Sequence, residues 1–108
     1  MLRTVQFYIP EGSNLTPLNR SIMIAIVIAY LEIDEFVEFV KTHTLHWYMW
    51  KTAKVPDELL NRFKSDVEER VGKKFTKADI VTYALQFVLS KYPNFMNIVS
   101  LTSSRQSK

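Results

Sequence analysis

Apolar and polar residues alternate with a period of two in the segment RTVQFYI, residues 3–9, just before Pro10. Val5, Phe7 and Ile9 fall on one face of such a segment, and the residues between them fall on the other. This alternation predicts a half-buried β-strand that ends at the proline.

The pattern then changes to one typical of helices. Thr16 can cap a first turn with its hydroxyl, and Pro17 suits the first helical position, so we expect a helix to begin there. Residues 22–31, IMIAIVIAYL, are apolar on every side, which favours burial in a core or a subunit interface. Two possibilities stay open for residues 34–45: Asp34 caps a second helix, or the first helix continues with a bend.

The second half of the chain repeats this order. Residues 47–55 are rich in aromatic and β-branched residues and precede Pro56, which predicts a second strand. Residues 57–71 place apolar side chains three or four positions apart, as one face of a helix does, and Gly72 follows where a C-terminal cap belongs.

A further helix is expected to open at Thr76, which forms a capping-box-like pair with Asp79. The order strand, helix, helix therefore occurs twice. We expect a mostly α-helical fold with a short antiparallel β-ribbon, organised as two repeats, residues 1–46 and 47–93. Residues 94–108 are expected to form a C-terminal extension whose end is disordered.

The amino-acid composition excludes several kinds of functional site. The chain has no cysteine, so disulfides, thiolate metal sites and cysteine nucleophiles are excluded, and it has only two glycines, too few for a phosphate-binding loop. The most apolar run is too short to cross a membrane. We expect a protein without a membrane partner, located in the cytoplasm, or in the host cytoplasm if the chain is viral.

The net charge of +3 is unevenly distributed. Residues 1–46 carry three Lys and Arg residues against five acids, and the remainder carries eleven against six. The second half is therefore the better candidate to contact a polyanion, although a solvated charged surface would give the same count.

Residues 48–92 resemble the ribbon-helix-helix family of DNA-binding proteins. The resemblance rests on a strand ending in Val-Pro, an acidic helix start, a Gly-basic-Thr connection and a last helix with Ile and Ala-Leu at core spacing. Residues 3–45 resemble the same unit more weakly, because the connection after the strand is longer and no glycine separates the helices. Together they resemble the tandem ribbon-helix-helix regulators of viruses that infect hyperthermophilic archaea.

The resemblance implies a ribbon that enters the major groove of double-stranded DNA. Side chains two, four and six residues before each strand-ending proline would contact bases, and these are Tyr8, Gln6 and Thr4 in the first repeat and Lys54, Thr52 and Trp50 in the second. The start of the last helix would hold phosphate through Lys73, Lys74, Thr76 and Lys77.

Side-chain chemistry agrees with part of this assignment. The Gln6 side chain can hydrogen-bond to adenine, and the Lys54 side chain can hydrogen-bond to guanine. Trp50 is poorly suited to hydrogen-bond with bases, so we expect it to pack against other side chains. Lys51 occupies a position that the family usually gives to an apolar residue. Asp34 and Glu35 occupy the positions where the first repeat would approach phosphate, and their carboxylates would repel it. We therefore expect the two repeats to bind the DNA backbone with unequal strength.

The sequence therefore predicts a DNA-binding transcriptional regulator that acts as a homodimer of tandem chains. We expect this regulator to be a repressor. It predicts no catalytic residue, no cofactor and no metal. His43 and His46 are three residues apart but lack the further ligands that zinc requires. The alternative is a protein-interaction module, such as an antitoxin with one ribbon-helix-helix half, or a dimer that has lost DNA binding.

Overall fold

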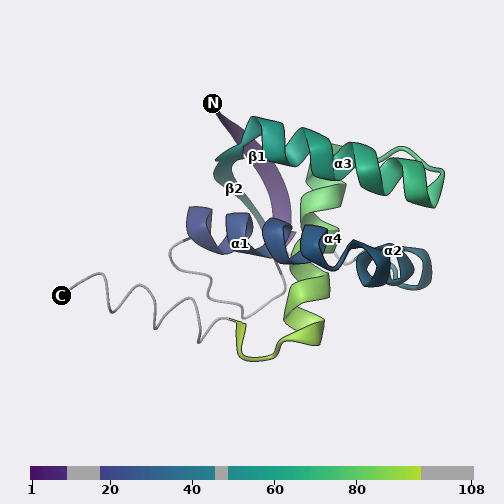
Figure 1. Cartoon of the computed structure of the whole chain (residues 1–108). Helices are drawn as coiled ribbons and strands as arrows, with labels where there is room; N and C mark the ends of the chain where they lie inside the picture. Colours follow the sequence, from purple (N-terminus) through teal and green to yellow (C-terminus); the bar gives the residue numbers. More distant parts are fainter. Residues whose placement is uncertain (10–17, 46–48, 96–108) are drawn as a thin grey trace.

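The computed structural model describes residues 1–9, 18–45 and 49–95. It contains a two-stranded antiparallel sheet and four helices, which confirms the mostly helical class with a β-ribbon. In chain order the elements are β1 (Leu2–Ile9), α1 (Leu18–Leu31), α2 (Ile33–Thr42), β2 (Met49–Pro56), α3 (Asp57–Val71) and α4 (Lys77–Lys91) (Figure 1).

The inner face of the ribbon forms one side of the core. Val5, Phe7 and Ile9 of β1 are buried, as the alternation predicted. In β2 only Ala53 and Val55 are buried, so the alternation there covers just the end of the strand. The ribbon therefore rests on the helices through one face and leaves the other exposed.

The helices cross between the two halves of the chain, residues 2–42 and 49–91. Helix α1 packs on β2 and α4, while α4 packs on β1, and α2 packs on α3. Figure 1 shows α4 running behind α1, from the level of α3 to below α1. The two halves consequently share one hydrophobic core instead of forming two separate ones.

Aromatic side chains join all four helices at the centre of this core. Phe36 of α2 lies 5.2 Å from the ring of Phe63 in α3 and 5.4 Å from that of Phe87 in α4. Tyr30 of α1 lies 5.5 Å from Phe63. These tilted and edge-on contacts are the arrangements that aromatic rings prefer, and they fix the helices against one another.

The connection between α3 and α4 has the local geometry that the sequence predicted. Gly72 adopts the left-handed conformation, with φ of 80°, and ends α3. The Thr76 hydroxyl accepts a hydrogen bond of 3.0 Å from the backbone N–H of Asp79 at the start of α4. Both predicted caps are confirmed.

The first two helices are separate, and Asp34 does not cap the second. Helix α2 begins at Ile33 after a break at Glu32, whose side chain makes no capping hydrogen bond, and Asp34 lies in the first turn. The carboxylate of Glu32 instead accepts hydrogen bonds from Lys91 and Tyr92 at the end of α4. Of the two possibilities left open for residues 34–45, the separate helix is the one observed, but Asp34 is not its cap because the break is held by contacts distant in sequence.

Some predicted features lie outside the described residues. These are the strand end at Pro10, the helix start at Thr16 and Pro17, the first residues of the predicted second strand, and the extension from residue 96 onward. The described part of β2 begins at Met49, and α1 is described from Leu18.

Candidate nucleic-acid interface

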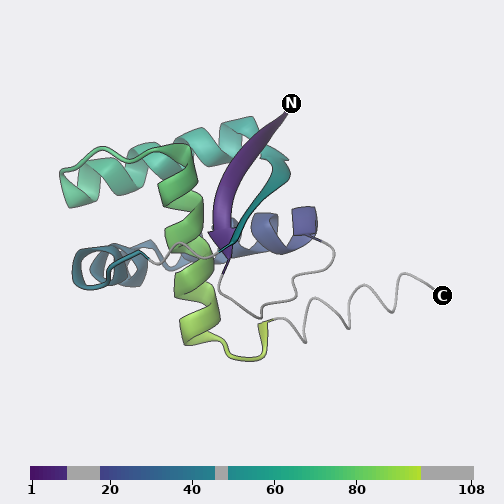
Figure 2. The ribbon, with the colours of Figure 1, turned by 180° about the vertical axis from the view of Figure 1, so that it is seen from behind.

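The exposed face of the ribbon carries all six predicted base-contacting residues. They stand opposite one another in three cross-strand pairs, Thr4 with Lys54, Gln6 with Thr52 and Tyr8 with Trp50. Five of the six are exposed and Tyr8 is half-buried. Figure 2 shows this ribbon from the side on which it lies nearer the viewer than α1. The structure therefore brings the six side chains onto one face.

The strand register is symmetric about the central pair. Gln6 and Thr52 lie four residues before Pro10 and Pro56, and they face each other. Positions two and six residues before the prolines consequently face each other at both ends of the ribbon. This is the register expected if the two strands are related by an approximate two-fold axis through the Gln6 and Thr52 pair.

Helix side chains hold both outer edges of the ribbon at matching positions. The backbone N–H of Tyr8 donates to Thr82 Oγ1 of α4 at 3.1 Å, and that of Lys54 donates to Asn19 Oδ1 of α1 at 2.9 Å. The Thr82 hydroxyl is buried and donates in turn to the carbonyl of Ala78 at 2.7 Å. Both N–H groups belong to residues two positions before a proline, so the anchors fix the positions of two predicted base contacts.

Asn19 and Thr82 were not predicted from the sequence. Thr82 carried a usable signal, because a hydroxyl within the apolar run of α4 needs a hydrogen-bond partner once it is buried. Asn19 carried none, since its partner lies 35 residues away in the chain.

An ion pair fastens the end of the ribbon to α3. The guanidinium of Arg3 contacts the carboxylate of Asp57, and the backbone N–H of Asp57 donates to the carbonyl of Met1 at 2.9 Å. Its hydrogen bond with Arg3 lowers the pKa of Asp57 below the ordinary value. The strand β1 is thus joined to the helix that follows β2.

The predicted phosphate contacts divide into two groups. Thr76 and Lys77 lie at the start of α4, and Lys77 is near enough to Asp57 for its charge to lower the pKa of that carboxyl. Lys73 and Lys74 follow the end of α3, where Lys74 Nζ lies 3.9 Å from Glu68. Because α3 begins directly after β2 and spans about 22 Å, its far end is distant from the ribbon.

Glu68 organises the turn in which these lysines lie. Its Oε2 atom accepts hydrogen bonds from the backbone N–H of Phe75 at 2.8 Å and from Lys64 Nζ at 3.0 Å. The backbone hydrogen bond is the first cause of its lowered pKa, and Lys64 adds to it. Lys73 Nζ lies over the Phe75 ring at 5.7 Å from its centre. The turn is therefore shaped before any ligand arrives.

Three ammonium groups near the ribbon lack an acidic partner. Within the part of the chain that the structure describes, Lys51, Lys54 and Lys77 form no salt bridge, whereas Arg62, Lys64, Arg70 and Lys91 all pair with carboxylates. Lys51 is exposed although strand alternation assigns it to the inner face. Their charge remains available to an anion.

The first turn of α2 contains two carboxylates, whereas the first turn of α4 contains Lys77 beside Asp79. The two carboxylates of α2 are those of Asp34 and Glu35, and the Asp34 side chain pairs with Arg70 of α3 at 2.6 Å. Glu35 accepts a hydrogen bond from Lys91 at 2.5 Å. The structure therefore places two carboxylates where the sequence analysis expected the first repeat to approach phosphate.

Two kinds of feature are absent from residues 1–9, 18–45 and 49–95. No group of three or more His, Asp or Glu side chains there could hold a metal ion, and none of the helices is long and apolar enough to cross a membrane. His43 stacks on Phe39, with ring centres 4.0 Å apart, while its suggested companion His46 is not among the described residues.

Comparisons with known proteins identify no relative: no model of a protein family, no curated protein and no solved structure matches this chain.

Proposed function

We propose that this chain is a transcriptional regulator that recognises double-stranded DNA by inserting the β1 and β2 ribbon into the major groove. The observation that carries the proposal is the exposed ribbon face, where six polar or aromatic side chains form three opposed pairs. None of the six is fully buried, so their identity is not dictated by the core. A two-stranded ribbon fits the major groove, where each base pair presents a distinct pattern of donors and acceptors.

The dimensions of the ribbon suit a short stretch of bases. Side chains two residues apart on a strand are separated by about 6.8 Å, so the three pairs span about 14 Å. With a rise of 3.4 Å per base pair, this corresponds to about four base-pair steps. Gln6 and Lys54 supply the chemistry for adenine and guanine, and the Tyr8 and Trp50 pair offers apolar contact at the other end.

Backbone contacts would come from the start of α4. The N-terminal amides of a helix favour an anion, and Lys77 adds a charge that forms no salt bridge among the described residues. The Asp79 N–H is already bonded to Thr76, and the Asp79 carboxylate lies in the same turn, so Lys77 would supply most of the attraction. Phosphate contacts of this kind give affinity without sequence preference. The acidic start of α2 would lack this contact, so the two halves would hold the DNA backbone unequally.

The repeated element order supports a tandem arrangement of two ribbon-helix-helix units. The symmetric register and the matching anchors at Tyr8 and Lys54 agree with it. In this arrangement one chain supplies both strands of the ribbon, where a single-unit protein needs two copies. A repressor role follows if the bound site overlaps a promoter, because the protein then excludes polymerase.

The first test is a selection of tight binders from random duplexes, followed by a mobility shift on the selected site and a scrambled duplex at two salt concentrations. Preference for one sequence that survives the higher salt supports base recognition. Equal binding that vanishes with salt contradicts it and indicates contact with phosphate alone. Absence of binding at both salt concentrations contradicts the whole proposal and favours the protein-interaction alternative.

Two ribbon variants test which residues recognise bases. Gln6→Ala and Lys54→Ala should each relax discrimination at particular base pairs by about 1–3 kcal/mol, roughly 5- to 150-fold, if each makes a good bidentate contact. Lys41→Ala is the matched control, since Lys41 is exposed on α2 away from the ribbon. Loss of affinity for every duplex alike, with unchanged sequence preference, would rule out base contacts by these two residues.

A third variant tests the phosphate contact. Lys77→Ala should weaken binding to all duplexes by a similar factor and reduce the slope of log affinity against log salt by about one. The matched variant Lys41→Ala should leave the slope unchanged. A changed sequence preference in Lys77→Ala with an unchanged slope would contradict the assignment.

A further inference from the structure

Helix α1 leaves a row of large apolar side chains in water. Of the seven large hydrophobic residues exposed in the described part of the chain, three stand in one row on this helix: Met23 at 38%, Val27 at 38% and Leu31 at 80% exposure. They are four residues apart and so form a single ridge on the helix surface. The opposite side of α1 is buried in the core.

The surroundings of this row are also apolar. Val27 and Leu31 line a shallow groove with Tyr30 and with Leu59 of α3. The Tyr30 hydroxyl donates to the carboxylate of Asp66, so its polar end is already satisfied. The sequence has no charged residue from position 21 to position 31. A surface helix normally turns a polar face to water, and α1 does not.

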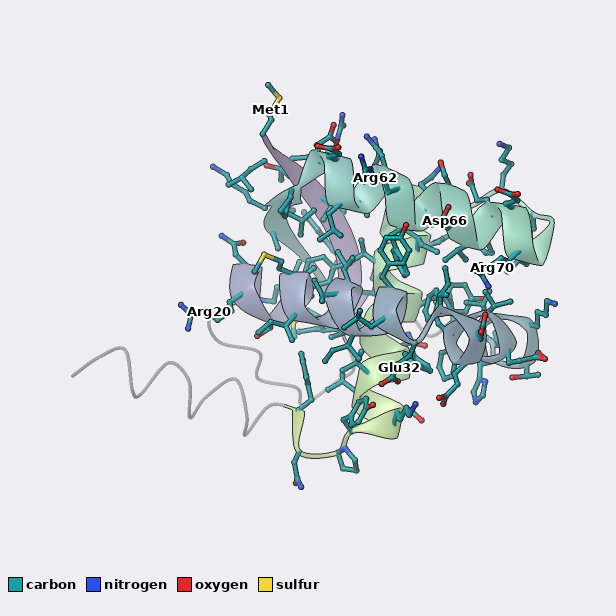
Figure 3. All side chains as sticks on the ribbon, in the orientation of Figure 1. Met1, Arg20, Glu32, Arg62, Asp66 and Arg70 are labelled. Atoms are coloured by element: carbon teal, nitrogen blue, oxygen red, sulfur yellow. The ribbon has the colours of Figure 1, made fainter. Side chains whose placement is uncertain are left out.

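Charge at the two ends of α1 indicates what covers the row. Arg20 lies at one end and Glu32 at the other, as Figure 3 shows. Asp34 and Glu35 follow Glu32, and although Arg70 and Lys91 pair with this acidic group, the Asp34 side chain remains 88% exposed. Two copies of α1 packed antiparallel would place the basic end of each against the acidic end of the other.

We propose that a second copy of this chain packs antiparallel across the Met23, Val27 and Leu31 row. Met23 and Leu31 are equally distant from Val27, so a two-fold axis at Val27 brings each Met23 against the Leu31 of the other copy. Such an isologous contact is complementary to itself in both shape and charge. The three residues of the row differ from the six ribbon residues, so the contact can be tested without DNA, although Asn19, one turn before Met23, bonds to the ribbon at Lys54.

The size of the surface determines how strong the pairing is. The ridge, with Tyr30 and Leu59 at its border, offers only a few side chains, whereas the interfaces of permanent dimers exceed about 2,000 Å². The pairing is therefore reversible and depends on protein concentration. A dimer formed through α1 would carry two ribbons, one from each copy.

The first experiment measures molar mass by sedimentation over a range of concentrations without DNA. The wild-type chain should shift from monomer towards dimer as concentration rises, and Leu31→Glu should abolish the shift. Leu2→Glu is the matched control, because Leu2 is 61% exposed at the end of the ribbon, and it should behave as wild type. A monomer at every concentration, or equal loss in the control, overturns the proposal.

The second experiment uses the absence of cysteine from the chain, which makes every introduced thiol unique. Val27→Cys should form a covalent dimer on mild oxidation faster than Leu2→Cys, because the axis brings the two thiols together. A mixture of Met23→Cys and Leu31→Cys should cross-link faster than either variant alone. A Val27→Cys rate no greater than that of Leu2→Cys, or no advantage for the mixture, overturns the antiparallel arrangement.

Discussion

The two helix breaks of the molecule are stabilised in different ways. The break between α3 and α4 is formed by its own residues, with Gly72 in the left-handed conformation, Thr76 capping α4 and Glu68 holding the N–H of Phe75. The break between α1 and α2 consists of Glu32, which has no local capping hydrogen bond. Its carboxylate is held by Lys91 and Tyr92, about 60 residues further along the chain.

This difference makes the first half dependent on the second. The end of α4 supplies the groups that fix the α1 and α2 junction, and α4 also packs against β1. Among the described residues, the hydrogen bonds of the α3 and α4 connection come from the second half itself. Helix α4 therefore packs against both halves and joins them in one core, although the sequence of elements repeats.

The largest effect is expected from a cavity in α4. Leu85 is fully buried in the shared core, so Leu85→Ala should lower the free energy of unfolding by about 2–5 kcal/mol. Both halves should unfold in one transition, with far-ultraviolet circular dichroism and tryptophan fluorescence giving the same midpoint in denaturant.

Leu2→Ala provides the same chemical change at an exposed position and should cost much less. Two separate transitions in Leu85→Ala would mean that the halves fold independently, which would contradict the single shared core.

The same contrast explains what the sequence could predict. The end of α3 at Gly72 and the start of α4 at Thr76 were predicted correctly, because each of these residues acts on its own neighbours. The strand β1 was predicted because one buried face imposes alternation. The break at Glu32 was not located, since no glycine or proline marks it and its stabilising partners are distant in the chain.

In the candidate site, too, features set by nearby residues were predicted, whereas features set by residues distant in the chain were missed. Counting back from the two prolines predicted six ribbon residues that do share one exposed face. The anchors Asn19 and Thr82 were missed because each bonds a strand 35 or more residues away. The four predicted phosphate residues were grouped by adjacency in sequence, whereas Lys74 pairs with Glu68 and Lys77 lies near Asp57.

A smaller effect is expected at the locally formed break. An added Cβ at Gly72 meets nothing within 4 Å, so the cost of Gly72→Ala comes only from the left-handed backbone. That cost is about 1–2 kcal/mol for a residue with a side chain, and chemical denaturation would measure it.

Gly72→Asn is the matched variant, because asparagine tolerates the left-handed conformation and should lose less. Equal losses in the two variants would show that the backbone conformation is not the cause. No glycine stands at the α1 and α2 break, so the first half has no counterpart of this effect.

The smallest effect is expected at Glu32 and depends on pH. Its hydrogen bonds with Lys91 and Tyr92 lower the pKa of the Glu32 carboxyl in the folded protein. A lowered pKa contributes stability above the ordinary value of about 4.3 and loses it as pH falls through the folded value. Glu32→Gln should therefore cost about 1 kcal/mol near neutral pH, in keeping with a partly exposed pair.

The difference between wild type and Glu32→Gln should shrink as pH falls below about 4.3, as denaturant unfolding at a series of pH values would show. Asp57 and Glu68 also have lowered pKa values, but both proteins contain them, so their effect cancels in the difference. Glu58→Gln removes a carboxylate from an exposed pair with Arg62 and should change little at any pH. A gap between wild type and Glu32→Gln that persists at low pH would mean that hydrogen-bond geometry, and not charge, holds the first break.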